Sequence, residues 1–440
     1  MSRLFGTDGI RGVANEQLTP EIAMHCGNAI SALKTKAVVV VGRDTRSSGD
    51  MLSMSLAGGA TSGGATVIDL GIVPTAGIAY LTRKFNADFG VVISASHNPN
   101  EYNGIKVFDG NGYKLSEAKE DEIEHRMRYH SYAVPEAIGR YIYNSEARWD
   151  YANYLTESSQ GDLSGMRIVL DCSNGAAFRI APEVFRRLNA DVVALSCGSS
   201  GCDINFECGS LHPEKLRAAV LEKHADAGFA YDGDSDRLVA VDEAGNIVDG
   251  DMLIYMLALS MQEQNLLRGN KVVGTSHTNM GVQKAFEKHG ITLLRSDIGD
   301  KYVMELMKKE KAMIGGEQSG HIILKHLSTT GDGILSSIQV ANLMKRSGKK
   351  LSELNDVKLF PQHNINVRVK EKLRILNNEQ IADALEKERM KLHGKGRIVL
   401  RASGTEELIR VFAESEDGAL AKSSAEQVAS VVREIDEMTC

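Results

Sequence analysis

The stretch Val91-Val92-Ile93-Ser94-Ala95-Ser96-His97-Asn98-Pro99 is the part of this 440-residue sequence on which the fold prediction depends. Its apolar start predicts a buried strand, and its hydroxyl, imidazole and amide side chains predict a loop at the end of that strand. A serine hydroxyl is a weak nucleophile at neutral pH, so Ser96 would need a base, a metal ion or an attached phosphoryl group to react. Taken alone, the stretch is equally compatible with a turn whose hydroxyls bond the backbone.

The same pattern, an apolar run that ends in polar residues, recurs along the chain. Residues 37–41, 167–170 and 271–274 are runs of this kind, and each is followed by helix-period segments and by further apolar runs. Continuous apolar runs predict strands that helices cover on both faces. The sequence therefore predicts three related α/β units with mixed sheets, in which ligands bind at the loops that follow the strands.

The C-terminal part of the chain has a different pattern. It predicts strands at residues 364–369, 396–400 and 408–413 and helices at residues 379–392 and 420–438. This order favours a smaller α+β domain. We therefore expect α/β domains at residues 1–150, 151–250 and 251–362 and an α+β domain at residues 363–440.

The composition excludes several classes of protein. A net charge of −7 argues against a nucleic-acid surface, which needs clustered Lys and Arg. No apolar segment is long enough to cross a membrane, and the first residues lack the apolar core of a signal peptide, so we expect a cytoplasmic protein that does not bind membranes. Cys197, Cys202 and Cys208 lie close in sequence, but without a paired C-x-x-C they favour free thiols over a zinc site.

The segment Asp232-Gly233-Asp234-Ser235-Asp236-Arg237 carries the strongest local signal for a metal ion. Three alternating carboxylates repel one another unless a cation lies among them, and oxygen ligands suit a hard metal. A helix-loop-helix calcium site is the competing interpretation. It fails because Arg237 stands at the sixth position, where that loop needs glycine, and because the flanking residues predict strands. Mg²⁺ with few protein ligands fits this spacing better.

Three weaker segments carry basic residues. Residues 5–12 and 42–46 are glycine-containing and include arginine, which suits an anion, although either could be a plain turn. The Asn103-Gly104 pair predicts a hairpin turn that would fold Lys106 back toward Ser96, and an ordinary surface lysine is the alternative.

Two further loops follow predicted strands. Residues 315–321 place a carboxylate and a hydroxyl two positions apart, at Glu317 and Ser319, which suits the hydroxyls of a sugar. Residues 401–410 combine hydroxyls, a glycine and two arginines, which suits a phosphate monoester. Capped or Ser/Gly-rich turns are the alternatives at both places.

Together these loops resemble the α-D-phosphohexomutase superfamily, and within it the branch of bacterial phosphoglucosamine mutases most closely. The resemblance covers nearly the whole chain and rests, in order, on residues 6–12, 94–99, 232–237, 316–321, 329–333 and 401–410. It implies three related α/β domains and a smaller fourth domain around a central cleft. It also implies that Ser96 carries a phosphoryl group and that this serine and Asp232, Asp234 and Asp236 hold Mg²⁺.

The resemblance assigns roles to the remaining candidate residues. It places a catalytic group of mostly basic side chains at Arg11, His97, Lys106, Arg237 and His321. It places sugar contacts at Glu317 and Ser319, and phosphate contacts at Arg401, Ser403, Gly404, Thr405 and Arg410. Bacterial members are commonly dimers, which makes a homodimer a possible assembly.

The implied reaction interconverts glucosamine 6-phosphate and glucosamine 1-phosphate through a bound glucosamine 1,6-bisphosphate, a step toward amino-sugar nucleotides. Gln318 is typical of this branch, whereas Ala402 also occurs in hexose-phosphate branches, so a phosphomannomutase or phosphoglucomutase is the runner-up. A phosphosugar phosphatase and a non-catalytic binding protein are further alternatives. Ser235, Glu407 and Ala76 depart from the usual pattern, and Glu407 would weaken phosphate binding if its charge pointed inward.

Overall fold

The computed structural model describes residues 3–6, 8–403 and 407–437 of the chain. These residues form two compact units. One unit comprises residues 1–277 and 292–355, and the other comprises residues 278–291 and 356–440. The predicted triad of aspartates and the Ser96 loop lie in the first unit, whereas the predicted phosphate loop lies in the second.

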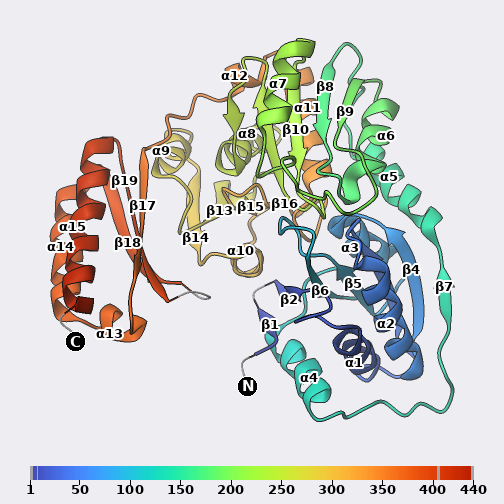
Figure 1. The fold of residues 1–440 in the computed structure, drawn as a ribbon. Helices are drawn as coiled ribbons and strands as arrows, with labels where there is room; N and C mark the ends of the chain where they lie inside the picture. Colours follow the sequence, from blue (N-terminus) through green and yellow to red (C-terminus); the bar gives the residue numbers. More distant parts are fainter. Residues whose placement is uncertain (1–2, 7, 404–406, 438–440) are drawn as a thin grey trace. The chain divides into compact units, whose positions relative to one another are not determined.

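The first unit contains three sheets within the described residues (Figure 1). The first sheet consists of β1 (Phe5–Gly6), β2 (Gly9–Val13), β3 (Val38–Arg43), β4 (Thr66–Ile72), β5 (Phe89–Ile93), β6 (Tyr102–Asp109) and β7 (Tyr141–Tyr143), in the spatial order β1-β2-β6-β5-β3-β4-β7. Its associated helices are α1 (Pro20–Ser31), α2 (Gly49–Ser62), α3 (Thr75–Lys84) and α4 (Glu117–Arg128).

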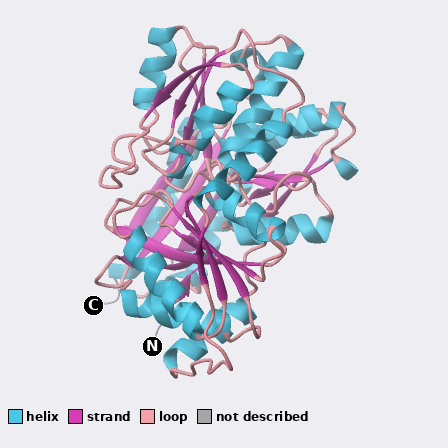
Figure 2. Ribbon diagram, turned by 90° about the vertical axis from the view of Figure 1, so that its right-hand side faces the viewer, coloured by secondary structure: helices cyan, strands magenta, loops and turns pink. Residues whose placement is uncertain are grey.

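Helices cover both faces of this first sheet, as its continuous apolar runs predict. Val39 and Val41 pack into one core with residues of α1, α2 and α4. Val40 points the other way, into a second core that contains Ile78 and Leu81 of α3. Figure 2 shows strands of the chain lying between helices in this way.

The second and third sheets are smaller. The second consists of β8 (Arg167–Asp171), β9 (Asp191–Leu195), β10 (Ala227–Tyr231), β11 (Leu238–Asp242) and β12 (Ile247–Val248), in the order β12-β11-β10-β8-β9. The third consists of β13 (Lys271–Thr275), β14 (Thr292–Ser296), β15 (Ile314–Gly316) and β16 (Ile322–Leu324), in the order β14-β13-β15-β16. The other helices of this unit are α5 (Arg148–Glu157), α6 (Ile180–Arg187), α7 (Glu214–Lys223), α8 (Gly250–Glu263), α10 (Asp300–Glu310), α11 (Gly333–Ser347) and α12 (Leu351–Leu354), with short 3₁₀ turns at Ser145–Ala147, Ala176–Phe178 and Arg268–Asn270.

The three sheets share one arrangement that positions the candidate site. In each, a strand that pairs in parallel with its neighbour is followed by an antiparallel partner: β5 by β6, β10 by β11, and β15 by β16. The connections between these pairs are residues 94–101, 232–237 and 317–321. The serine loop, the aspartate loop and the predicted sugar loop therefore occupy the same place in three related sheets.

The predicted hairpin turn at Asn103-Gly104 is wrong. Both residues lie inside β6, where Asn103 pairs with Gly12 and Gly104 pairs with Arg11 of β2. The chain reverses earlier, over residues 94–101, because β6 is a central strand with β5 on its other side. Asn-Gly favours a tight turn only where no neighbouring strand competes for the backbone hydrogen bonds.

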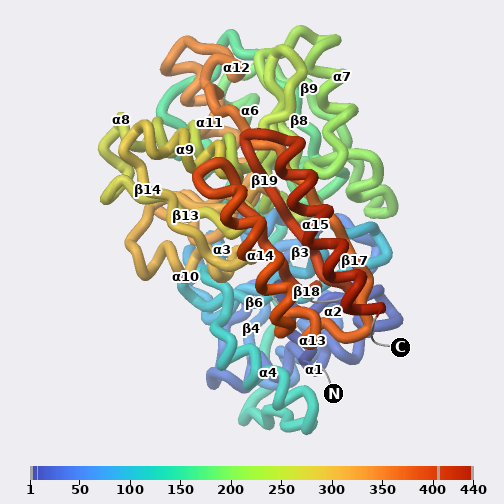
Figure 3. The backbone as a smooth tube through the Cα atoms, turned by 90° about the vertical axis from the view of Figure 1, so that its left-hand side faces the viewer, coloured from blue at the N-terminus to red at the C-terminus, as the bar shows by residue number. Residues whose placement is uncertain are grey.

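The second unit contains an antiparallel sheet with two long helices. Its elements are α9 (Met280–Lys288), β17 (Gln362–Arg368), α13 (Lys372–Leu376), α14 (Glu379–Leu392), β18 (Gly396–Ala402), β19 (Leu408–Ser415) and α15 (Gly418–Glu437), with the strands in the order β17-β19-β18. Helices α14 and α15 lie side by side and share a core with the sheet (Figures 1 and 3). Among the described helices, none combines the length and the sustained apolar character that a bilayer-spanning segment needs.

Helices α1 and α2 pack closely because glycine lies at their contact. A Cβ atom added at Gly59 would lie 1.9 Å from the carbonyl oxygen of Met24, and one at Gly27 would lie 2.0 Å from that of Leu56. Neither backbone oxygen can move aside without separating the helices. The neighbouring Gly58 is exposed and has no atom within 4 Å of the same position.

We therefore expect Gly59→Ala to destabilise the protein by about 1–3 kcal/mol, as overpacking of a close contact does. Gly58→Ala, one residue away on the same helix, should be neutral or stabilise by about 0.5–1 kcal/mol, because alanine is the better helix former. Thermal unfolding followed by circular dichroism tests both variants. Equal unfolding midpoints for the two would contradict this account of the helix contact.

Candidate active site

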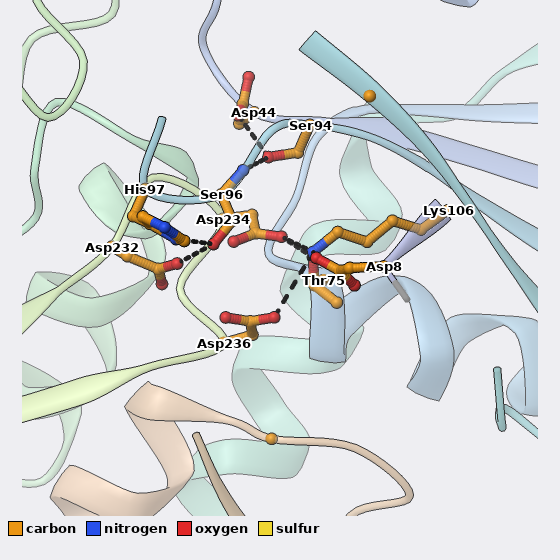
Figure 4. Close-up of polar contacts among 12 residues, drawn as sticks. Asp8, Asp44, Thr75, Ser94, Ser96, His97, Lys106, Asp232, Asp234 and Asp236 are labelled. Atoms are coloured by element: carbon orange, nitrogen blue, oxygen red, sulfur yellow. Dashed lines mark hydrogen bonds and ion pairs between the residues drawn. The ribbon is translucent and has the colours of Figure 1, made fainter. Parts of the chain in front are cut away.

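Ser96 is held in a defined orientation at the end of β5. It is 1% exposed and has a φ angle of 53°, a left-handed conformation that costs a residue with a side chain on the order of 1 kcal/mol. Its N–H donates to the Ser94 hydroxyl at 2.9 Å, and that hydroxyl donates to Asp44 at 2.6 Å. The Ser96 hydroxyl in turn donates to Oδ2 of Asp232 at 2.5 Å (Figure 4).

The buried side chain of Arg46 fixes the rest of this loop. Its guanidinium pairs with Asp44 at 2.9 Å and donates to the carbonyl oxygens of Ser96 and Asn98, each at 2.8 Å. It also bonds two carbonyls further along, at Pro99 and Tyr102. The suggestion that residues 42–46 bind an anion is therefore wrong for Arg46, whose donors are used by the backbone of the serine loop.

Asp232, Asp234 and Asp236 come together at the end of β10, as their spacing predicts. Their ligand atoms lie within 4.8 Å of one another, and this is the one such group of three metal-ligating side chains among the described residues. All three are buried, with exposures of 0%, 1% and 4%. Burial, together with the charges of Asp236 and Asp234, raises the pKa of Asp232 well above its usual range.

Two buried oxygens show where a cation fits. Oδ1 of Asp234 and Oδ1 of Asp236 are buried and have no hydrogen-bond partner, although Arg237 lies 4.0 Å from Oδ1 of Asp236. The Oδ2 atoms contact Lys106 and His321. An unpartnered buried carboxylate oxygen is costly unless a cation compensates it. The donor set of carboxylates and the Ser96 hydroxyl suits a hard divalent cation.

Lys106 lies among the acidic side chains although it sits in the middle of a strand. It is 1% exposed, and its Nζ lies 2.9 Å from Asp234, 3.2 Å from Asp8 and 3.6 Å from Asp236. Burial alone would lower the pKa of Lys106, but Asp234 and Asp8 outweigh it and raise the pKa well above its usual range. Lys106 is therefore a buried, protonated cation beside the aspartates, and not a surface lysine.

His321 lies between Asp236 and Asp300, and its Nε2 accepts a hydrogen bond from the Gly331 N–H at 3.1 Å. Its ring nitrogens lie 3.6 Å from Asp236 and 3.6 Å from Asp300. Burial opposes protonation, but Asp236 and Asp300 together raise the pKa of His321. Lys114 joins this network through ion pairs with Asp8 and Asp300.

The pKa of His97 shifts in the opposite direction, downward. Its Nδ1 lies 3.2 Å from the Ser96 hydroxyl. Burial and the nearby charges of Arg237 and Arg11 lower the pKa of His97 to about 4. His97 is therefore neutral at pH 7 and presents a hydrogen-bonding ring to Ser96 without adding charge.

The two arginines of the candidate site contact the serine loop and the aspartate loop. Arg11 donates to the Asn98 side chain at 2.9 Å and pairs with Asp8. The Arg237 backbone N–H donates to Asp232 at 3.1 Å, and its guanidinium lies 4.0 Å from Asp236.

The predicted sugar loop is the β15–β16 connection. Glu317 is half-buried, and its Oε1 accepts a hydrogen bond from the Gly299 N–H at 3.1 Å, whereas Ser319 is exposed. Next to this loop, the Gly333 N–H donates to the Ser235 carbonyl at 2.9 Å, so residues 329–333 support the aspartate loop.

The candidate phosphate residues lie in the second unit. Arg401 and Arg410 are directly opposite on β18 and β19, so two guanidiniums share one face of the sheet. Burial and the charge of Arg410 lower the pKa of Arg401. Such a pair favours a bound anion, and Ser403 follows on the same loop, whereas Gly404 and Thr405 lie outside the described residues. Glu407 is 71% exposed and pairs with Lys372 at 3.3 Å, which offsets its charge.

Several residues that contact this site were not predicted from the sequence. They are Asp8, Asp44, Arg46, Thr75, Lys114 and Asp300. Asp8 lies in a glycine-rich segment that was already a candidate, whereas nothing in the local sequence distinguishes Thr75. The three cysteines considered for zinc, Cys197, Cys202 and Cys208, are free thiols.

Comparison with known families gives matches over nearly the whole chain. The models are described as phosphoglucomutase/phosphomannomutase α/β/α domain I, domain II, domain III and C-terminal domain, and they match residues 2–133, 149–245, 249–360 and 365–431. These matches confirm the predicted fold class of three α/β domains followed by a C-terminal domain.

Curated relatives and solved structures agree with these family matches. A phosphoglucosamine mutase from Caldanaerobacter subterraneus subsp. tengcongensis is 47% identical over 442 residues, with 98% of this chain and 99% of the relative covered. One from Carboxydothermus hydrogenoformans is 45% identical over 444 residues, with 99% and 100% covered.

Among solved structures, a phosphoglucomutase/phosphomannomutase family protein from Burkholderia thailandensis has a TM-score of 0.83 at 22% identity, over 98% of each chain. The N-acetylphosphoglucosamine mutase of Aspergillus fumigatus has a TM-score of 0.70 at 17% identity, over 98% of this chain and 95% of that one. At these identities the structures show a shared fold, whereas the family models and curated relatives show descent. The chain therefore belongs to the phosphoglucomutase/phosphomannomutase family.

Proposed function

We propose that this protein is a phosphosugar mutase that interconverts glucosamine 6-phosphate and glucosamine 1-phosphate through a phosphorylated Ser96 and a bound glucosamine 1,6-bisphosphate. The observation that carries the proposal is the 2.5 Å contact between the Ser96 hydroxyl and Asp232, within a buried group of three carboxylates. This places a hydroxyl that can carry a phosphoryl group directly beside a site for a divalent cation.

The residues fit phosphoryl transfer, in which positioning and charge stabilisation do most of the work. Mg²⁺ held by Asp232, Asp234, Asp236 and an oxygen at Ser96 would neutralise charge on the transferring phosphoryl group. Protonated Lys106 adds positive charge beside Asp234, His321 lies beside Asp236, and Arg237 and Arg11 supply donors near the serine loop. A hydroxyl oxygen of the sugar would attack phosphorus as the bond to Ser96 breaks, and the hydroxyl proton would pass to the Ser96 oxygen. After the bisphosphate has turned over, the Ser96 oxygen would attack its other phosphorus, which restores the phosphoserine and returns the proton to the sugar oxygen that leaves.

The mutase reaction also requires that either end of the sugar phosphate be accepted. We assign Arg401, Ser403, Gly404, Thr405 and Arg410 to binding the phosphate that is not being transferred. Glu317 and Ser319 would hold sugar hydroxyls in both orientations of the bisphosphate. The opposed arginines Arg401 and Arg410 support the first assignment, since a dianion between them relieves their repulsion.

The choice of amino sugar rests on the relatives, which are named phosphoglucosamine mutases at 43–47% identity over nearly the full chain. Gln318 in the sugar loop agrees with that branch. A homodimer and a cytoplasmic location stay predictions, which light scattering after size-exclusion chromatography and cell fractionation would test.

Ser96→Ala should reduce mutase activity on the order of 10⁴-fold or more, because it removes the atom that carries the phosphoryl group. Intact-mass measurement after incubation with glucose 1,6-bisphosphate should show one added phosphoryl group in the wild type and none in the variant. Ser31→Ala is a matched control, since Ser31 is also buried in the first domain but bonds only to its own helix. Full activity of Ser96→Ala would refute the assignment.

Asp236→Asn should reduce activity on the order of 10²–10³-fold and raise the Mg²⁺ concentration needed for half-maximal rate, because it removes a charged ligand and the partner of Lys106 and His321. The measurement is initial rate against Mg²⁺ concentration for chelator-treated enzyme. Asp242→Asn is the control, as this buried aspartate bonds only within the β11–β12 turn. An unchanged Mg²⁺ dependence of Asp236→Asn would exclude Asp236 as a ligand.

Assays in parallel with the 1-phosphates of glucosamine, glucose and mannose should give the highest kcat/KM for glucosamine 1-phosphate, by about tenfold or more over either hexose. Release of inorganic phosphate is measured in the same reactions. A preference for glucose or mannose would make the protein a hexose-phosphate mutase of the same family. Stoichiometric phosphate release without isomerisation would make it a phosphatase.

A further inference from the structure

Thr75 connects the first α/β domain to the aspartate loop of the second. It is the first residue of α3 and is 1% exposed. Its hydroxyl donates to Oδ2 of Asp234 at 2.6 Å, and its backbone N–H donates to the Asp234 carbonyl at 3.0 Å (Figure 4). Both hydrogen bonds therefore reach a single residue that lies 159 positions away in sequence.

The two oxygens of the Asp234 carboxylate have different surroundings. Oδ2 receives the Thr75 hydroxyl and also the ammonium of Lys106 at 2.9 Å. Oδ1 is buried and has no hydrogen-bond partner. A carboxylate whose one oxygen is bonded from two directions resists rotation about its last torsion, which is otherwise soft. Oδ1 is consequently kept available for a cation.

Lys106 alone would not hold the Asp234 carboxylate in one orientation. Its ammonium also lies 3.2 Å from Asp8 and 3.6 Å from Asp236, and it stands at the end of a long, flexible side chain. Thr75 has a β-branched side chain with one torsion, fixed at the start of a helix, and its hydroxyl hydrogen points to one acceptor. The hydroxyl thus supplies the directional contact and the ammonium supplies the charge.

We propose that Thr75 is a positioning residue for the divalent cation: its hydroxyl holds Asp234 in the orientation that presents Oδ1 to the metal. This rests on the proposed metal site and adds a residue from the first domain that does not itself touch the metal. Residues that orient a metal ligand in this way commonly change metal affinity by about 10–100-fold when they are replaced.

The alternative is that Thr75 has a purely structural role. The same hydrogen bonds also join two domains, so their loss could lower stability and leave the metal site unchanged. The two roles differ in one measurable quantity, the affinity of the metal-free protein for the cation. That affinity is independent of any sugar or phosphoryl chemistry.

The test is isothermal titration of chelator-treated protein with Mn²⁺ or Mg²⁺, together with the thermal midpoint of each variant. Thr75→Val removes the hydroxyl but keeps the shape and the backbone N–H, and should weaken metal binding about tenfold or more. Thr75→Ser restores the hydroxyl and should bind like the wild type. Thr82→Val is the matched control, because Thr82 is equally buried on the same helix and its hydroxyl bonds only the Ile78 carbonyl.

The outcomes separate the possibilities. Weak binding by Thr75→Val with near-normal binding by Thr75→Ser and Thr82→Val supports the proposal. Wild-type affinity in Thr75→Val overturns it, whatever happens to the thermal midpoint. If Thr75→Val does not fold, Thr75→Ala gives the same comparison against Thr75→Ser. Absence of binding in the wild type would refute the metal site itself, which is a different failure.

Discussion

Three carboxylates buried beside one serine hydroxyl are the constraint on which the rest of the first unit depends. Asp232, Asp234 and Asp236 lie within 4.8 Å of one another, where their mutual repulsion is strong because little water is present. Lys106 contacts Oδ2 of Asp234, and His321 contacts Oδ2 of Asp236, whereas Oδ1 of Asp234 is buried without a hydrogen-bond partner. This buried group of carboxylates and one hydroxyl fits a divalent cation.

The architecture supplies this arrangement by repeating one element three times. Each α/β sheet of the first unit ends its parallel part with an antiparallel partner strand, and the connection between the two strands carries the functional residues. Antiparallel partners can be joined by a short connection, which leaves little freedom for the residues in it. The repeated fold therefore presents different candidate residues at the same place, with a serine in one loop, aspartates in the next and a glutamate in the third.

Much of the precision comes from residues that do not carry the chemistry. Arg46 bonds the carbonyls of the serine loop, Thr75 bonds Asp234, and the Gly333 N–H bonds Ser235. These contacts use donors of fixed geometry on rigid elements, which is how a site is kept in shape before its ligand arrives.

The sequence by itself determined the fold class, the repeated strand-and-loop pattern, the aspartate triad and the family. The fold class, the repeated pattern and the triad are visible locally because buried strands need continuous apolar runs and alternating aspartates are costly without a cation. The family came from the resemblance of the loop motifs along the chain. The sequence misplaced the turn at Asn103-Gly104, and it left open whether residues 42–46 bind an anion or form a plain turn. Only the tertiary structure decided these points, as well as the contacts of Lys106, Thr75 and Asp300. These contacts are made with residues far away in sequence. No local sequence pattern indicates which strand lies beside β6 or which carboxylate a buried donor contacts.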